Sequence, residues 1–285
     1  MNEVFAAENI FLYVIGIIWV LIASIHDLRK REVANWLSFS LIAVALSYRL
    51  FYSALSGNWH FSLFGLIGFA VFFAIANLLY YGRVFAGGDA KLMMALGAVV
   101  PFYNSFLENI TFFGFFIFIV MFLGGIYGLF YSSWLIFRNK KEFSKEFLFQ
   151  LKSRKKLAVI SMISGVILLI AVFVVGEIML IIIPALCFLV PLLFSYAKAI
   201  ENSCMIKSVN VSEISTGEWL VENLIVKGRK IRAGWQGVSE DELEFLRKNY
   251  KGKIKIKQGI PFVPSFLIAL LFLLWNPLGS FWKFF

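Results

Sequence analysis

Long apolar runs recur along the whole of this 285-residue chain, and they constrain its fold more than any other feature. About 20 apolar residues in a helix cross the hydrocarbon core of a bilayer. The runs lack the alternating polarity of the strands in a membrane barrel, so we predict helices. Hydropathy indicates eight spans, at roughly 9–26, 35–54, 61–81, 90–101, 109–137, 158–175, 178–197 and 261–280.

The composition excludes an ordinary soluble domain. The chain is 60% hydrophobic and only 15% charged, whereas a soluble protein needs more polar surface because charged residues are nearly always exposed. The fourth apolar run is short, since a helix of about 12 residues extends only about 18 Å. We therefore expect this run either to continue through Pro101 or not to cross the membrane fully.

The distribution of Lys and Arg predicts the orientation of the chain. With the amino terminus outside, 25 of the 27 basic residues fall in the inner loops, 27–34, 82–91, 138–157 and 198–260. The outer loops hold none. This asymmetry follows the positive-inside rule, and a net charge of +10 suits the anionic lipid of an inner leaflet. Because the basic residues are spread over several loops rather than one patch, we expect membrane lipids and no nucleic acid as partners.

One polar segment, residues 199–260, is predicted to be a small cytoplasmic α+β insert. The stretch "EWLVENLIVKGRKI" indicates two strands joined by a turn at Gly228. Ser239 and Glu242 form a capping-box pattern that begins a helix, and "KGKIKIKQGI" alternates like a strand with one buried face. The fold class is therefore an all-α polytopic membrane protein with this insert. Its predicted divisions are a membrane helical catalytic domain, the insert and a C-terminal membrane helix, at 1–198, 199–260 and 261–285.

Two aspartates fall on the same side of the predicted membrane. Asp27 follows the first span, in "LIASIHDLRKREVANWL", and Asp89 precedes the fourth, in "FAGGDAKLMM". Carboxylates at such positions are costly and usually functional. Two of them in one site share a proton and can act as acid and base. Because Asp89 begins a helix and Asp27 ends one, the helix dipoles favour Asp89 as the ionised member and Asp27 as the protonated one.

The neighbours of Asp89 have functional and structural interpretations. Gly87 and Gly88 lack a Cβ, so a substrate backbone could approach Asp89 closely. Lys91 either tunes the pKa of Asp89 or extends to the membrane interface. Asp89 could equally cap a helix, and Asp27 could be a plain juxtamembrane residue. The two histidines and two cysteines are too dispersed for a ligand set, so we predict no metal and no cofactor.

Two motifs resemble a known family. The segment "DLRKREVANW" after the first span and "GGDAK" before a later one are similar to the prepilin peptidase and archaeal preflagellin peptidase family, whose members are membrane aspartyl proteases of the GxGD type. The resemblance covers most of residues 9–137 and, less specifically, "IKQGIPFVPSFLIAL". Ala86 stands where the signature has its first Gly. The paired cysteine motifs of many bacterial members are absent, which favours the archaeal branch.

The resemblance implies an aspartic endopeptidase at the cytoplasmic boundary of the cell membrane. Its substrates would be type IV pilin-like or archaellin precursors with short basic leader peptides, and Asp27 and Asp89 would be catalytic. Two other functions remain open from the residues alone. A proton-coupled transporter could use the same carboxylates as a relay, although such sites usually lie near the midplane. A non-catalytic pilus-assembly protein could use the insert to bind partners.

Overall fold

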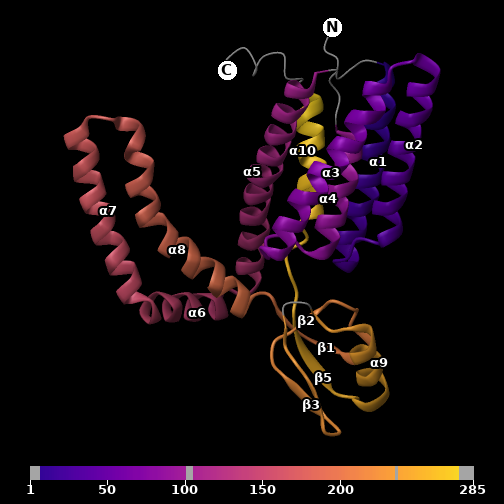
Figure 1. Ribbon diagram of the computed structural model, residues 1–285. Helices are drawn as coiled ribbons and strands as arrows, with labels where there is room; N and C mark the ends of the chain where they lie inside the picture. Colours follow the sequence, from indigo (N-terminus) through magenta and orange to yellow (C-terminus); the bar gives the residue numbers. More distant parts are fainter. Residues whose placement is uncertain (1–6, 101–104, 235–236, 276–285) are drawn as a thin grey trace. The chain divides into compact units, whose positions relative to one another are not determined.

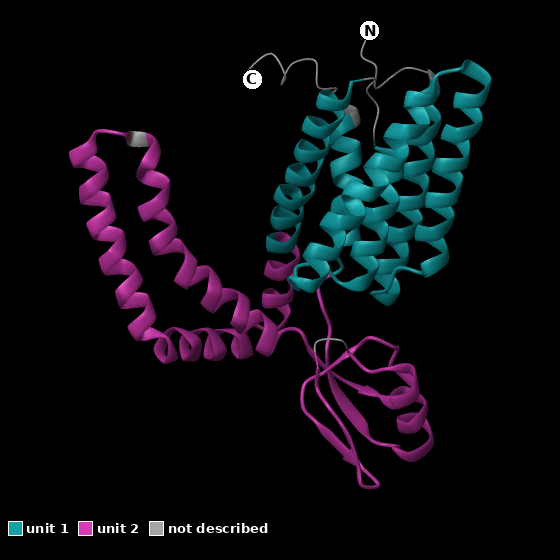
Figure 2. Cartoon of the chain, in the orientation of Figure 1, with its two compact units in different colours: residues 1–129, 261–285 teal, residues 130–260 magenta. Residues whose placement is uncertain are grey.

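The computed structural model describes residues 7–100, 105–234 and 237–275, and these are mostly helical (Figure 1). The chain divides into two compact units (Figure 2). Residues 1–129 and 261–285 make up the first, and residues 130–260 make up the second. The first unit is therefore built from two segments that the whole of the second unit separates in the sequence.

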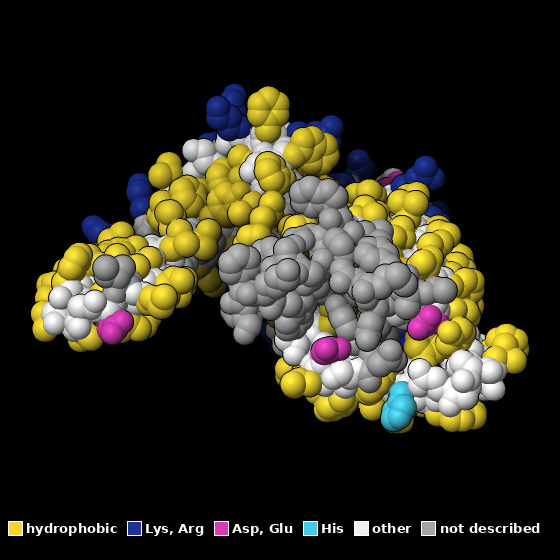
Figure 3. Space-filling view, turned by 90° about the horizontal axis from the view of Figure 1, so that it is seen from above, with side chains coloured by type: hydrophobic (Ala, Val, Ile, Leu, Met, Phe, Trp, Pro, Cys, Tyr) yellow, Lys and Arg dark blue, Asp and Glu magenta, His cyan; other side chains and the backbone are white. Residues whose placement is uncertain are grey.

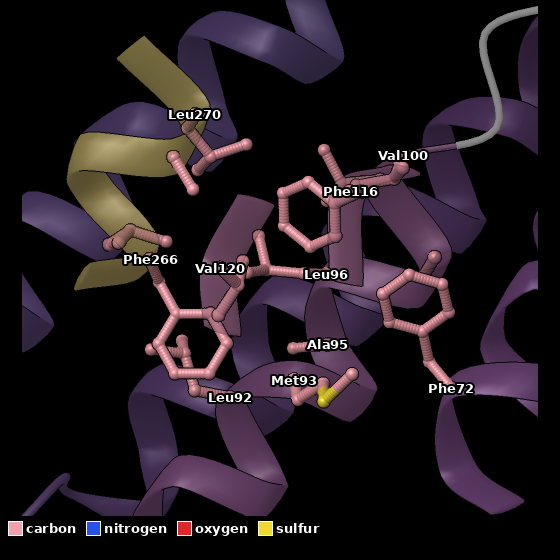
Figure 4. Close-up of a cluster of buried hydrophobic side chains, with 14 of the residues drawn as sticks. Phe72, Leu92, Met93, Ala95, Leu96, Val100, Phe116, Val120, Phe266 and Leu270 are labelled. Carbon is pink, nitrogen blue, oxygen red and sulfur yellow. The ribbon is translucent and has the colours of Figure 1, made fainter. Parts of the chain in front are cut away.

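Within the described residues, the first unit contains five complete helices and most of a sixth. They are α1 (Ala7–Lys30), α2 (Asn35–Ser56), α3 (Trp59–Tyr81), α4 (Gly87–Val99), α10 (Val263–Trp275) and the greater part of α5 (Phe106–Arg138). Nine of the 13 residues of α4 are buried, and α4 packs against α1, α2 and α3. Side chains of α3, α4, α5 and α10 converge in one apolar cluster, in which the rings of Phe72 and Phe116 lie 5.9 Å apart (Figure 4). The helix that carries Asp89 is thus in the interior of this unit.

Among the described residues, six helices are long and apolar enough to cross a membrane, judged by length and composition. They cover Glu8–Lys30, Asn35–Ser56, Trp59–Tyr81, Phe106–Arg138, Lys155–Val175 and Met179–Ser203. These coincide with six of the eight predicted spans. The other two predicted spans correspond to the 13-residue α4 and to α10, and parts of both, at residue 101 and residues 276–280, lie outside the described residues. The count of eight spans and the orientation of the chain stay predictions.

Apolar side chains cover much of the outer surface of these helices, as the space-filling view shows (Figure 3). On α5, Phe118 and Phe122 are 60% and 55% exposed, and on α7 Val174 is 82% exposed. Exposed apolar surface of this extent indicates contact with lipid. Together with the six long helices, it supports a multi-pass membrane protein.

The second unit begins with the end of α5, from Phe130, and continues with three further helices. They are α6 (Lys140–Ser153), α7 (Lys155–Val175) and α8 (Ile182–Ser203), with a short 3₁₀ segment, η2 (Ile178–Ile181), before α8. α7 and α8 pack along each other. They are joined at Gly176, whose positive φ of 80° ends α7. The predicted tight turn between the sixth and seventh spans is therefore confirmed.

Helix α6 was not expected, because the sequence analysis treats residues 138–157 as a basic loop. Its aromatic residues recur at helical spacing, and the rings of Phe143 and Phe147 stack 5.6 Å apart. Phe143 also packs against Tyr196 of α8, at 5.8 Å. Gln150, one turn further along, is buried. The sequence analysis placed residues 138–157 in an inner loop and predicted no helix there, because four lysines hide an apolar stripe with a period of 3.6 residues.

The remainder of the second unit is the small strand-containing region. Its elements are β1 (Ile206–Asn210), η3 (Val211–Glu213), β2 (Trp219–Leu220), β3 (Leu224–Val226), β4 (Arg229–Ile231), α9 (Glu240–Asn249) and β5 (Lys253–Lys257). The strands form an antiparallel sheet in the order β1-β5-β2 and a separate β3-β4 ribbon. Ile254 and Ile256 of β5 are both 2% exposed, and they join a core with Leu243 and Leu246 of α9.

Three local predictions for this region are confirmed. The turn between β3 and β4 falls at Lys227 and Gly228, both with positive φ. Ser239 and Glu242 each accept a backbone N–H from the other, so the capping box begins α9. The alternating "KIKIK" segment is β5, with isoleucines buried and Lys253 and Lys255 exposed.

Candidate active site

Asp27 lies in the last turn of α1 and is 6% exposed. The helix ends at Lys30, and Arg31 follows with a left-handed φ of 57° while its N–H closes the turn onto the carbonyl of Asp27. The carboxylate Oδ2 of Asp27 accepts the backbone N–H of Val263 at 3.0 Å. Val263 is the first residue of α10, where an N–H has no acceptor within its own helix. Asp27 therefore ends one helix and receives the positive amino end of another.

The sequence around Val263 explains why this N–H is available. Pro264 is the second residue of α10, and proline suits the first turn of a helix because it has no N–H to satisfy. The chain before it, through Pro261 and Phe262, packs its Phe262 ring 5.4 Å from the ring of Phe85. The sequence analysis missed Val263, because nothing local in the sequence links a residue of the C-terminal helix to Asp27.

Asp89 is the third residue of α4 and is 8% exposed. Its Oδ2 accepts the backbone N–H of Ala86, the residue before the helix, at 3.2 Å. The structural interpretation expects Asp89 at the N-cap, but Ala86 holds that position, and the Asp89 carboxylate reaches back from the third helical position to its N–H. Ala86 has φ −72° and ψ 163°, an extended conformation that any residue adopts. The backbone therefore places no demand for glycine at this signature position.

The structure brings the surroundings of Asp27 and Asp89 together within the first unit. Phe85, in the loop before α4, is buried against the rings of Phe262 and Phe266 at 5.4 and 5.8 Å. Burial raises the pKa of Asp89, the charge of Asp27 raises this pKa further, and the N–H of Ala86 lowers it. The two carboxyl groups are thus close enough to interact electrostatically, which a helix cap alone does not require.

Gly88 and Gly87 differ in how much space surrounds them. A Cβ on Gly88 would lie 3.1 Å from the Cβ of Val33 and 3.3 Å from its backbone N. Gly88 therefore lets the connection between α1 and α2 lie directly against the start of α4. A Cβ on Gly87 would meet only the ring of Tyr80, at an ordinary 3.7 Å. A substrate backbone that approaches Asp89 would therefore find space beside Gly87, whereas Val33 already fills the space beside Gly88.

Lys91 makes a contact that the sequence analysis does not anticipate. Its ammonium group donates to the side-chain oxygen of Asn35, the first residue of α2, at 2.7 Å. This bond joins α4 to α2 close to Asp89. Tuning of the Asp89 carboxyl by Lys91 stays a prediction, whereas a role for Lys91 in joining two helices follows directly from the contact.

The arrangement suits acid–base chemistry at the ends of helices. Two buried carboxyl groups that interact cannot both ionise easily, so one of them tends to hold a proton. An ionised carboxylate can take a proton from water while its protonated neighbour polarises a carbonyl oxygen. Within the described ranges, no group of three or more His, Cys, Asp or Glu side chains is arranged to hold a metal ion.

Comparisons with known proteins agree with this part of the chain. Residues 14–129, which include Asp27 and Asp89, match the model of the type IV leader peptidase family. The preflagellin peptidase of Methanocaldococcus jannaschii is 36% identical over 92 residues, which are 32% of this chain and 39% of that protein. The preflagellin peptidase of Methanococcus voltae is 32% identical over 91 residues, again 39% of its length. The resemblance stated from the motifs is confirmed, and the aligned segment spans about two fifths of these curated relatives.

Proposed function

We propose, from the family match of residues 14–129 and the buried pair of Asp27 and Asp89, that this protein is a membrane aspartic endopeptidase. Its substrates are type IV pilin-like or archaellin precursors, from which it removes a short basic leader peptide. The observation that carries the proposal is the burial of two carboxyl groups, 6% and 8% exposed, on separate helices of one unit, where the charge of Asp27 acts on Asp89. The preflagellin peptidases that match the chain supply the substrate class.

The proposed reaction hydrolyses one peptide bond. The ionised carboxylate takes a proton from a water molecule while the water oxygen attacks the carbonyl carbon. The protonated carboxyl group donates its proton to the carbonyl oxygen, which gives a neutral tetrahedral intermediate. When this intermediate collapses, the C–N bond breaks, the leaving nitrogen takes a proton from the group that acted as base, and a hydroxyl of the intermediate returns its proton to the group that acted as acid. The pair then again holds one proton.

The described contacts favour a different assignment of roles from the one based on each aspartate's own helix. Burial disfavours ionisation of Asp27, whereas the N–H of Val263 at the amino end of α10 and the positive charge of Arg31 favour it. Burial and the charge of Asp27 raise the pKa of Asp89. We therefore propose Asp27 as the ionised base and Asp89 as the protonated acid. The dipoles of the two helices that carry the aspartates suggested the opposite, because α10 is absent from any argument based on the local sequence.

The topology forms part of the same proposal. The amino terminus is outside, the chain makes eight spans, and the reaction takes place on the cytoplasmic side of the cell membrane. Asp27 precedes the basic residues Arg29 to Arg31, and Asp89 follows Arg83, which supports placing both carboxylates at the positive inner boundary. Residues 1–198 and 261–285 would form the membrane part, and 199–260 would form the cytoplasmic insert.

The test uses the full-length protein in lipid nanodiscs with a pilin-like or an archaellin precursor. Wild type, Asp27→Asn and Asp89→Asn are compared by mass spectrometry of the precursor. We expect wild type to release a leader-sized fragment, and each variant to lose activity by at least about 10⁴-fold, as when a member of a catalytic group is removed. Asp241→Asn is the matched control, because it makes the same change at an exposed position on α9.

Three results would reject parts of the proposal. Cleavage by both Asp27→Asn and Asp89→Asn at the wild-type rate would show that these two carboxylates are not the acid and the base. No cleavage of either precursor class by folded wild type would reject the peptidase function. Cleavage of precursors whose leader lysines and arginines are replaced by alanine, at an unchanged rate, would reject the requirement for a basic leader.

A further inference from the structure

Arg49 is the largest of the fully buried side chains, with 0% of its surface exposed. It lies in the middle of α2, inside a candidate membrane span. A guanidinium group in such a place is costly unless it is paired and hydrogen-bonded. The positive-inside pattern does not account for it, since it belongs to no loop. Its contacts therefore need a separate explanation.

The guanidinium group of Arg49 binds the carboxyl end of α4. Its Nε donates to the carbonyl of Ala98 at 2.8 Å, and its Nη2 donates to the carbonyl of Val99 at 3.0 Å. The last carbonyls of a helix have no partner within it, and they form the negative end of the helix dipole. Arg49 supplies both the hydrogen-bond donors and the positive charge that the end of α4 lacks.

Two residues of α3, Phe61 and Gly65, also surround the side chain of Arg49. Its Nη1 donates to the carbonyl of Phe61 at 3.1 Å, and the guanidinium carbon lies 4.4 Å from the centre of the Phe61 ring. Gly65, one turn along, leaves the space for the side chain, because a Cβ there would lie 2.3 Å from Cδ of Arg49. The side chain is therefore held between α2, α3 and α4 in one defined position.

Helix α2 holds α4 at both ends. Asn35, its first residue, binds Lys91 near the start of α4, and Arg49 binds the end of α4. Asn35 and Arg49 are 14 residues apart on α2, and their partners Lys91 and Ala98 are seven residues apart on α4, about 10 Å along its axis. Two contacts at separate points of α4 oppose its movement along its own axis. Asp89 is the third residue of α4, so such a movement would carry its carboxyl group with it.

We propose that Arg49 is a positioning residue for Asp89. By capping the far end of α4, it fixes the position of this helix along its axis, and therefore the position of the Asp89 carboxyl group relative to that of Asp27. This inference rests on the proposed peptidase function. Arg49 does not touch the substrate, so its loss affects the chemical step and leaves substrate binding nearly unchanged.

The experiment compares full-length variants in nanodiscs by two independent measurements. Arg49→Met removes the charge and the hydrogen-bond donors. Arg49→Lys keeps the charge but has only one donor group, the ammonium. Gly65→Ala places a Cβ against Cδ of Arg49. Leu50→Ala is the control, since the neighbouring Leu50 is 56% exposed. The first measurement is kcat and KM for precursor cleavage. The second is hydrogen exchange of the α4 amides, which requires no activity.

We expect Arg49→Met and Gly65→Ala to lower kcat by about 10- to 100-fold, the effect of misplacing a catalytic group by about 1 Å. KM should stay within about twofold of wild type, because ground-state binding is not altered. Exchange of the α4 amides should become faster in both variants. Arg49→Lys should lie between Arg49→Met and wild type, and Leu50→Ala should match wild type in both measurements.

Two results would overturn the proposal: a folded Arg49→Met protein with wild-type kcat, or a fall in kcat without faster exchange in α4. If Arg49→Met does not fold, Gly65→Ala decides by the same criteria. If wild type cleaves no precursor, the proposed function fails on its own. In that case unchanged α4 exchange in Arg49→Met would still refute the capping role, and faster exchange would support it.

Discussion

The carboxylate of Asp27 accepts the backbone N–H of Val263 at 3.0 Å, across a separation of 236 residues in the sequence. The first and last described helices of the chain, α1 and α10, therefore meet at the candidate active site. Because an N–H at the amino end of a helix stabilises an anion, this contact favours the ionised form of Asp27. It makes α10 part of the site rather than only an additional membrane helix.

Replacing Val263 tests this contact directly. Val263→Pro removes the N–H, while proline is compatible with the first position of a helix. Val263→Ala keeps the N–H and removes only side-chain volume. We expect cleavage to fall by about 10-fold or more in Val263→Pro relative to Val263→Ala, since a hydrogen bond to a charged group is worth about 1.5–3 kcal/mol. Equal kcat in the two variants would show that this donor does not matter for the base.

The pKa of Asp89 predicts a dependence of stability on pH. Because burial and the charge of Asp27 raise this pKa in the folded state, the folded protein keeps a proton that the unfolded chain loses near pH 3.9. The stabilisation from this group is therefore full below about pH 4 and is lost as the pH rises through the folded pKa. The midpoint temperature of thermal unfolding in nanodiscs should fall as the pH rises through this range in wild type, and it should fall less in Asp89→Asn. Equal slopes in the two proteins would contradict the prediction, and Asp241→Asn should behave as wild type.

The bond between Lys91 and Asn35 predicts a coupling between two helices. Lys91→Met and Asn35→Ala should each lower the stability by about 1 kcal/mol, as for a single hydrogen bond. The double variant should lose little more than either single variant, because both changes remove the same interaction. A double-mutant cycle of thermal unfolding measures this. Fully additive losses would mean that Lys91 acts independently of Asn35, for example by tuning Asp89.

Gly87 and Gly88 should respond differently to alanine. A Cβ at position 88 would press on Val33, with its backbone N at 3.3 Å, whereas at position 87 it meets only the ring of Tyr80 at 3.7 Å. Gly88→Ala should destabilise the protein by about 1–3 kcal/mol, the usual effect of overpacking, and should lower activity as a result. Gly87→Ala should keep wild-type stability. If Gly87→Ala raises KM, the substrate backbone passes over this residue; a wild-type KM would reject that access.

Local patterns predicted much of the fold. Six apolar runs correspond to six long helices, and Ser239 with Glu242 located the start of α9. The alternation of Ile254 and Ile256 with lysines identified β5. Each of these features depends on residues close together in the sequence. The pattern failed in α6, where Phe143 and Phe147 share a helix with four lysines and the charge concealed the apolar stripe.

The candidate site was predictable only in its two aspartates. Asp27 and Asp89 are conspicuous because carboxylates are rare beside apolar runs. The residues around them are not: Val263 reaches Asp27 through its backbone N–H, Arg49 reaches the far end of α4 through its side chain, and neither has a local pattern that indicates its role. The assignment of base and acid depends on those partners. It could therefore be inferred only after the packing of α10 was known.

The division of the first unit into two stretches of sequence has a consequence for biosynthesis. A ribosome completes α1 and α4 long before it reaches residue 263, and all of residues 130–260 are translated in between. A nascent chain therefore holds both carboxylates before it holds the amide that Asp27 accepts, and on the proposed function we expect it to be inactive until α10 is in place. Premature termination anywhere within residues 130–260 would leave a membrane-embedded fragment with an incomplete centre.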